Sequence, residues 1–274
     1  MQPATKPALR LRRKNLKRNN HFLPECYQRG FTDSSGKLWI KPQGKEPKYR
    51  NPSAGRRRSL YIVEIDGVAH DDIEDFFDRS VEAPFAQLSQ RIKEEQHQFR
   101  NMSAIERGVL CRFVASQAVR TIAQWNCMSV QAGAPVDSRT FLRNMLRLIK
   151  TITMAWTDNP PVVDFYTVLP HIGEQFITGD HPVLVIRLTD NSVWVPSSAP
   201  ELKITNIKDL LADDSCRFWL ALSPYVYASI RMLAGGKAQL PPATVDPQFV
   251  RLFNGLIRGQ CSLFTVAKDR NFLI

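Results

Sequence analysis

Four polar residues have the side-chain types that phosphodiester chemistry needs: His21, Glu82, Arg120 and Asp180. An imidazole such as that of His21 donates or accepts a proton near neutral pH. A carboxylate from Glu82 or Asp180 could orient that imidazole or hold a divalent metal ion, and the guanidinium of Arg120 could stabilise the charge on a phosphate. These four are therefore the candidate catalytic residues of an enzyme that cleaves or transfers phosphate groups, with the metal requirement left open.

The same four residues also fit a purely structural arrangement. A buried Arg120 needs an acid, and Glu82 or Asp180 would then join a helix to the sheet. His21 would cap a turn. Asp180 follows Gly179, a residue that permits unusual backbone angles, and would accept hydrogen bonds from the backbone amides of its own hairpin. The sequence alone is compatible with both interpretations.

The basic residues are concentrated at the N-terminus. Residues 1–60 hold 16 Lys and Arg against 3 acids, whereas the other 214 residues hold 21 against 23, so the net charge of +11 is almost wholly N-terminal. Lys and Arg that neutralise phosphates release condensed counterions, which favours binding to nucleic acids. We therefore expect a nucleic acid or another phosphate-rich partner, with these candidate nucleic-acid-binding residues: Arg10, Arg12, Arg13, Lys14, Lys17 and Arg18.

Two classes of function remain after this step. The first is action on, or binding to, a nucleic acid, including a nuclease of a defence or toxin type. The second is a non-enzymatic module whose polar residues are structural and whose basic arm docks an acidic protein. Trp39, Tyr49 and Tyr61 lie among the basic residues, where they would either stack on bases or pack within a hairpin of their own.

Other classes of protein are disfavoured by what the sequence lacks. It contains no stretch of eighteen uncharged apolar residues, so we expect no membrane-spanning helix. The five cysteines are far apart and never form a C-x-x-C pair, which argues against a disulfide framework or a structural zinc site and favours a cytoplasmic protein. Motifs of nucleotide-binding proteins and of the common hydrolases, such as the P-loop and G-x-S-x-G, do not occur.

The order of apolar patterns predicts an α+β fold, in which a helical block is followed by a mostly antiparallel sheet. We expect a flexible basic arm over residues 1–18, a single α+β domain over residues 19–274, and an extended loop from Lys41 to Arg58. A strand over 60–65 comes before helical patterns over 73–92, from Ser103 to about Cys127, and after Asp137. Strands are then expected over 165–169, 175–178, 183–188, 193–195, 218–222 and 263–267, with a helix over 246–256.

Several short motifs along the chain carry a family resemblance. The first is Asn20-His21-Phe22-Leu23-Pro24, followed by Tyr27 and Phe31, and it resembles the opening of the bacterial domain-of-unknown-function family 4238. Further similar positions follow in the family's order: Glu82, Ser103 to Arg107, Gln117, Arg120-Thr121, Asp180 to Val183, Leu222-Ser223-Pro224 and Asn254. His181 stands where the family usually has Asn, and Gln28 where it usually has Leu. The resemblance extends over about residues 19–267 and implies no established activity.

Overall fold

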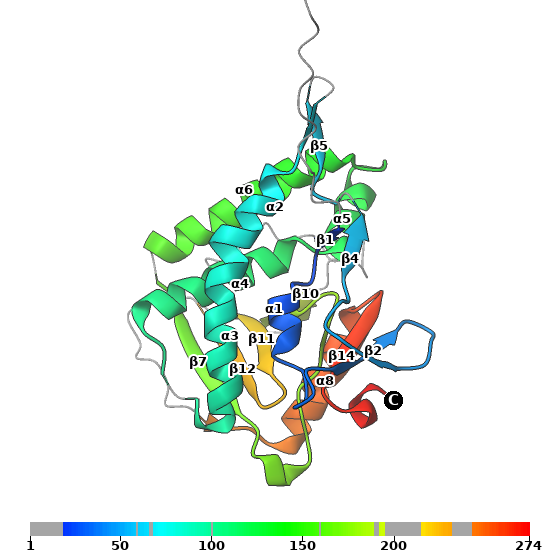
Figure 1. Ribbon diagram of the computed structural model, residues 1–274. Coiled ribbons are helices and arrows are strands. Elements are labelled where there is room, and N and C mark those ends of the chain that lie inside the picture. Colours follow the sequence, from blue (N-terminus) through cyan, green and yellow to red (C-terminus); the bar gives the residue numbers. More distant parts are fainter. Residues whose placement is uncertain are drawn as a thin grey trace, which may run out of the picture.

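The computed structural model describes residues 19–58, 60–65, 68–99, 101–158, 160–188, 192–194, 215–231 and 243–274. Within this part of the chain, helices cover a mostly antiparallel sheet, so the predicted α+β class is confirmed (Figure 1). The predicted basic arm, residues 1–18, lies outside the described residues. None of the described helices is long and apolar enough to cross a membrane.

The first helical pattern forms one continuous helical rod of three parts. These are α2 (Asp72–Phe77), the π turn η1 (Asp78–Glu82) and α3 (Ala83–Glu95), after which η2 (Gln96–Gln98) closes the segment. Pro84 lies in the first turn of α3, directly after η1. Because proline has no N–H to continue an α-helical ladder, the widened π turn is accommodated at this point without ending the rod.

The second helical pattern is broken where the sequence predicts continuity. The prediction of one helix from Ser103 to about Cys127 is wrong, because α4 (Ala104–Val119) is capped by Arg120 and a second helix, α5 (Ile122–Gln131), begins after it. At the break the Thr121 hydroxyl accepts a hydrogen bond from the Gln124 amide at 3.2 Å and caps the new helix. The predicted start is confirmed, since Ser103 and Glu106 form a capping box. The expected third helix is α6 (Ser138–Asp158).

The larger sheet has six strands in the order β10-β9-β11-β12-β7-β13. Their bounds are β7 (Val162–Thr167), β9 (Val183–Arg187), β10 (Ser192–Trp194), β11 (Cys216–Ser223), β12 (Val226–Arg231) and β13 (Ala243–Thr244). All neighbours are antiparallel except the pair β13 and β7. Phe218 contacts Trp156 of α6, whereas Trp219 contacts Phe249 of α8 (Pro247–Gln260), so helices cover both faces of the sheet.

The smaller sheet has the order β3-β2-β14-β8 and joins the two ends of the chain. It contains β2 (Leu38–Pro42), β3 (Lys48–Arg50), β8 (Thr178–Gly179) and β14 (Phe264–Ala267). The rings of Trp39 and Tyr49 lie 5.2 Å apart across the β2–β3 hairpin, so these two aromatics pack on each other.

The expectation of an extended loop over residues 41–58 is therefore wrong in part. In addition to β3, this segment contains β4 (Arg56–Arg58), which pairs with β1 (Asn19–His21). The strand expected over 60–65 is shorter, because β5 (Val63–Ile65) pairs only with β6 (Val68–His70). The remaining short elements are α1 (Glu25–Arg29), η3 (Pro170–Ile172) and η4 (Arg270–Leu273).

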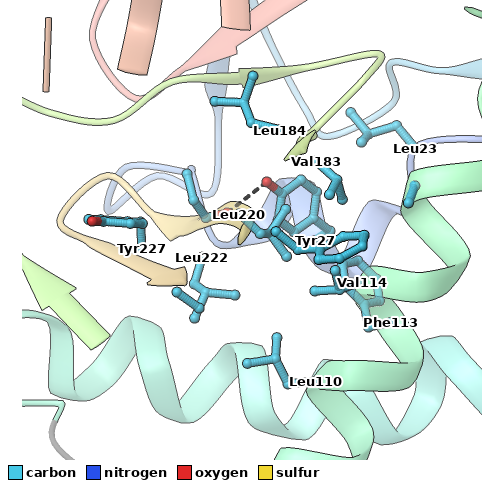
Figure 2. Close-up of a cluster of buried hydrophobic side chains, with 14 of the residues drawn as sticks. Leu23, Tyr27, Leu110, Phe113, Val114, Val183, Leu184, Leu220, Leu222 and Tyr227 are labelled. Atoms are coloured by element: carbon cyan, nitrogen blue, oxygen red, sulfur yellow. Dashed lines mark hydrogen bonds between the residues drawn. The ribbon is translucent and has the colours of Figure 1, made fainter. Parts of the chain in front are cut away.

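The core lies between the helical rod, α4 and the larger sheet. Figure 2 shows Tyr27 of α1 among side chains of α4, β9 and β11. The Tyr27 hydroxyl donates to the Ala221 carbonyl at 2.7 Å and is 2.8 Å from the Thr178 hydroxyl. Burial raises the pKa of Tyr27, so this hydroxyl stays protonated and available as a donor. Tyr27 thus connects the N-terminal helix to both sheets.

Candidate functional site

Three of the four candidate catalytic residues lie together. His21 comes from β1, Glu82 from the π turn η1, and Arg120 from the residue that ends α4. Glu25 of α1 and Arg56 of β4 complete the group, which is called here the polar cluster. Each member is placed by a different element, so the cluster depends on the tertiary fold and not on a local motif.

Arg120 is the buried centre of the polar cluster. Its Nη2 donates to Glu82 Oε1 at 2.7 Å and to the backbone carbonyl of His21. The guanidinium carbon lies 4.2 Å from the centre of the Phe77 ring and 5.8 Å from that of Tyr61. The Arg120 side chain has 0% exposure, whereas that of Glu82 has 18%. Burial alone would lower the pKa of Arg120, but Tyr61 and the Glu82 carboxylate outweigh burial and raise it, so the cation persists at every accessible pH.

His21 is held by a cation as well as by a carboxylate. Its Nε2 accepts a hydrogen bond from Arg56 Nε at 2.6 Å and lies 3.4 Å from Glu25 Oε1, and Arg56 also binds Glu25 through Nη2. Burial lowers the pKa of His21, against the opposing effect of Glu25. The imidazole is therefore neutral near pH 7, and the lone pair that a general base would use already accepts the Arg56 proton.

Asp180 does not belong to the polar cluster. Its carboxylate accepts hydrogen bonds from the backbone amides of Ser262, Leu263 and Phe264, at 3.3, 3.1 and 3.1 Å, and from the Ser262 hydroxyl at 3.2 Å. Burial raises the pKa of Asp180, and these hydrogen bonds offset part of that effect. Within the described residues, no hydrogen bond or ion pair joins Asp180 to His21, Glu82 or Arg120. The acid that pairs with Arg120 is therefore Glu82.

The structural role of Asp180 differs in detail from the predicted hairpin turn. The amides that it binds belong to the two residues before β14 and to Phe264, its first residue, and lie more than eighty residues further along the chain. Gly179, the residue before it, is required because a side chain would not fit at this position, and not because the backbone angles are unusual. A Cβ at this position would lie 2.4 Å from Cys261 Sγ and 2.6 Å from the Phe264 carbonyl oxygen. Gly179 and Asp180 together fasten β8 to β14.

Two other residues of the family-like motifs bind the backbone in the same way. Asn254 of α8 accepts a hydrogen bond from the Ile177 amide at 3.0 Å and donates to the Gln175 carbonyl at 2.9 Å. Asn20 accepts from the Tyr61 amide at 3.1 Å. Both side chains are buried. Through these hydrogen bonds, the two side-chain amides hold backbone segments that are not paired in a sheet at those residues. This is a structural role.

Two structurally important contacts were not predicted from the sequence. Gln28, in the usual place of Leu, is fully buried, accepts from the Ala54 amide at 2.9 Å and donates to the Ala54 carbonyl at 2.8 Å. Asp164 and Arg231 form an ion pair of 2.7 Å between β7 and β12. The departure from the family's usual Leu at position 28 was the available signal for the first contact. The second has no sequence signal, because it depends on strand register.

The candidate nucleic-acid-binding residues Arg10, Arg12, Arg13, Lys14, Lys17 and Arg18 lie outside the described residues. The second basic run is described, and Arg56, Arg57 and Arg58 are exposed along β4. Across the described ranges, no group of three or more His, Cys, Asp and Glu side chains could hold a metal ion.

Comparison with protein-family models places this chain among its relatives. Residues 19–159 match the model of a family described as a protein of unknown function, DUF4238. No curated protein and no solved structure matches the chain. The matched segment contains the N-terminal motif, the helical rod and α4, and with them every member of the polar cluster. On this match, which extends over more than half of its residues, the chain belongs to the DUF4238 family.

Proposed function

We propose that this protein binds nucleic acid through a basic surface centred on β4 and the N-terminal arm, and that the polar cluster stabilises the fold without acting as a catalyst. The observation that carries the proposal is the pairing of β1 with β4, in which Asn19 lies opposite Arg58. Arg18 directly precedes Asn19. The two basic runs of the sequence, forty residues apart, are thereby attached at the same place on the fold.

The charge of this surface supports a polyanionic partner. Arg57 and Arg58 are exposed, and within the described residues neither forms an ion pair with a carboxylate. Arg56 differs from them, because it is bound to Glu25 and His21. These two guanidinium groups, which have no carboxylate partner among the described residues, lie beside Asn19, where the basic run that ends at Arg18 joins the fold. Such groups favour phosphate oxygens as their partners.

An aromatic ring beside these arginines fixes one of them in place. The Arg57 guanidinium carbon lies 4.9 Å from the centre of the Trp125 ring. Trp125 is only partly buried, stacks on Phe141 at 4.6 Å, and is held by a hydrogen bond from its Nε1 to the Val136 carbonyl at 2.9 Å. The Trp125 ring, which Phe141 and Val136 hold, therefore keeps the Arg57 guanidinium at a defined place on the β4 surface, where it can meet a phosphate.

The geometry of the polar cluster favours binding over cleavage. Arg120 has no exposed side-chain area with which to contact a phosphate, and His21 Nε2 is already occupied by Arg56. Asp180 is bound to backbone amides elsewhere. An acid–base catalyst must reach the proton that it transfers, and an electrostatic catalyst must touch the developing charge. The alternative of a nuclease requires a rearrangement of all three residues.

The test is fluorescence anisotropy of the full chain with labelled single-stranded RNA, single-stranded DNA and duplex DNA over a series of salt concentrations. Replacing Arg57 and Arg58 together by Gln should weaken binding and reduce the slope of log K against log salt by about 1.4, since each phosphate contact to a single strand contributes about 0.7. The matched control is Arg147→Gln/Lys150→Gln, which removes the same charge from exposed positions of α6. This control should leave the slope unchanged.

Three outcomes would contradict the proposal. The first is no saturable binding to any nucleic acid at low salt, which would favour an acidic protein partner. The second is an equal loss of affinity in the α6 control, which would show that charge alone matters and not the β4 surface. The third is cleavage of any substrate with Mg²⁺ or Mn²⁺ that Arg120→Lys abolishes in a folded protein, which would make the polar cluster an active site.

A further inference from the structure

A groove separate from the polar cluster lies between the helical rod, α4 and α6. Its volume is about 610 Å³. The apolar part of its lining comes from α2 and α6, and consists of Ile73, Phe76, Leu146, Ile149 and Met154. Phe76 is 37% exposed and Met154 is 53% exposed, although both are large apolar side chains. Sites for small ligands have this size and this mostly apolar character.

The groove also has cations at fixed places. Arg112 of α4 and Lys150 of α6 both line it. Arg112 Nη1 donates to the Ser80 carbonyl at 3.2 Å, which holds the guanidinium against the π turn η1 and leaves its other N–H groups for a ligand. Within the described residues, neither Arg112 nor Lys150 forms an ion pair with a carboxylate. Among the described residues, Asp72 is the only acid in the lining, and it lies 3.6 Å from His70 Nδ1.

The π turn is the element that shapes this lining. It inserts an extra residue into the helical rod, and Ser80 within it both lines the groove and accepts the Arg112 hydrogen bond. Interruptions of this kind occur frequently at functional sites. The opposite side of the same turn presents Glu82 to Arg120. One side of the turn therefore binds Arg120 in the polar cluster, and the other side faces the groove.

We propose that this groove binds a small amphipathic anion, a carboxylate with an unbranched apolar chain. The carboxylate lies between Arg112 and Lys150, and the chain covers Phe76, Leu146 and Met154. A neutral apolar ligand would leave two cations beside its surface without a counter-charge, and a small inorganic anion would leave the apolar wall open to water. Only a ligand with both parts complements the lining.

The experiment is isothermal titration calorimetry of the full chain with dodecanoate below its micelle-forming concentration. We expect saturable binding of one molecule. Acetate, which has the head group alone, and dodecyltrimethylammonium, which has the same chain with the opposite charge, should each bind at least tenfold more weakly. The two-ligand comparison separates the contribution of the cations from that of the apolar wall.

Variants of the protein test the two parts of the site separately. Arg112→Gln/Lys150→Gln should weaken dodecanoate binding about 10- to 100-fold, because charge-assisted hydrogen bonds are lost. Leu146→Trp fills the groove from a half-buried position and should abolish binding without lowering Tm. The matched control Arg143→Gln/Arg147→Gln changes two exposed cations on α6 that do not line the groove, and should bind within twofold of the unaltered protein.

Four results would overturn the assignment. They are the absence of saturable heat with dodecanoate, equal affinity for dodecyltrimethylammonium, equal weakening in the Arg143→Gln/Arg147→Gln control, and full binding by a folded Leu146→Trp variant. The nucleic-acid proposal does not depend on any of them, since it concerns β4 and not α6.

Discussion

The ion pair between Glu82 and Arg120 gives the sharpest test of a structural polar cluster. In Glu82→Gln, a guanidinium with no exposed area loses its carboxylate and keeps the His21 carbonyl and the two aromatic faces. Removing one partner of a buried ion pair costs about 3–5 kcal/mol. Because Glu82 is 18% exposed and Gln retains an accepting oxygen, we expect about 2–3 kcal/mol. In a protein of this size that lowers Tm by about 4–12 °C.

A second variant separates the charge from the packing. Glu82→Met/Arg120→Met removes both members of the pair, so no uncompensated charge stays in the core. Replacement of a buried pair by apolar residues is often neutral, and we expect the double variant to be more stable than Glu82→Gln by about 1 kcal/mol or more. The assay is urea unfolding followed by circular dichroism, with m-values compared to ensure that the same transition is measured.

An exposed ion pair supplies the control for these measurements. Glu46 lies 3.5 Å from Arg270, with side-chain exposures of 87% and 50%, and Glu46→Gln should change the free energy of unfolding by less than about 0.5 kcal/mol. The reasoning is refuted if Glu82→Gln is as stable as the unaltered protein, or if the double variant loses as much stability as the single variants Glu82→Met and Arg120→Met combined.

Three further predictions concern other contacts of the fold. Tyr27→Phe should lower the free energy of unfolding by about 1–3 kcal/mol, because the buried Ala221 carbonyl loses its donor. The control Tyr225→Phe should have little effect. Equal losses of stability for the two variants in urea unfolding would contradict this prediction. Burial lowers the pKa of His181 to about 4, so stability should fall by on the order of 3 kcal/mol as pH drops from about 6.5 to 4 and the unfolded state takes up the proton. His181→Asn should flatten that part of the pH profile in thermal melts, and an unchanged slope would refute the assignment to His181. Ser103→Ala should cost about 0.5–2 kcal/mol through loss of the α4 cap, and Ser103→Thr should restore most of it.

The local elements were largely predictable from the sequence, because their signals are local. The Ser103–Glu106 capping box and the apolar stripe after Asp137 each specify a helix through neighbouring residues, and both helices form as predicted. The break at Arg120 was not predictable in this way. The apolar pattern continues through it, and the acid that holds the Arg120 side chain inside the protein at this point, Glu82, is distant in the sequence.

The sequence predicted the residue types of the candidate site, but not how these residues are arranged relative to one another. Arg120 was expected to meet an acid, and Glu82 was one of two candidates. The separation of Asp180 from the polar cluster depends on the pairing of β8 with β14, which places backbone amides over its carboxylate. The occupation of His21 by Arg56 depends likewise on the pairing of β1 with β4. Strand register over long distances in the chain has no local signal, so these two outcomes required the structure.

The pairing of β2 with β14 has a consequence for how the protein is made. Pro42 lies opposite Phe264, more than two hundred residues later in the chain. At about 5–20 residues per second, a ribosome would deliver β14 about 10–45 s after β2. Throughout that interval one edge of β2 has no native partner, because β14 does not yet exist, and the Tyr27 hydroxyl has none until Thr178 and Ala221 have been made. The smaller sheet can therefore close only after β14 has left the ribosome, and contacts of such long sequence separation form slowly.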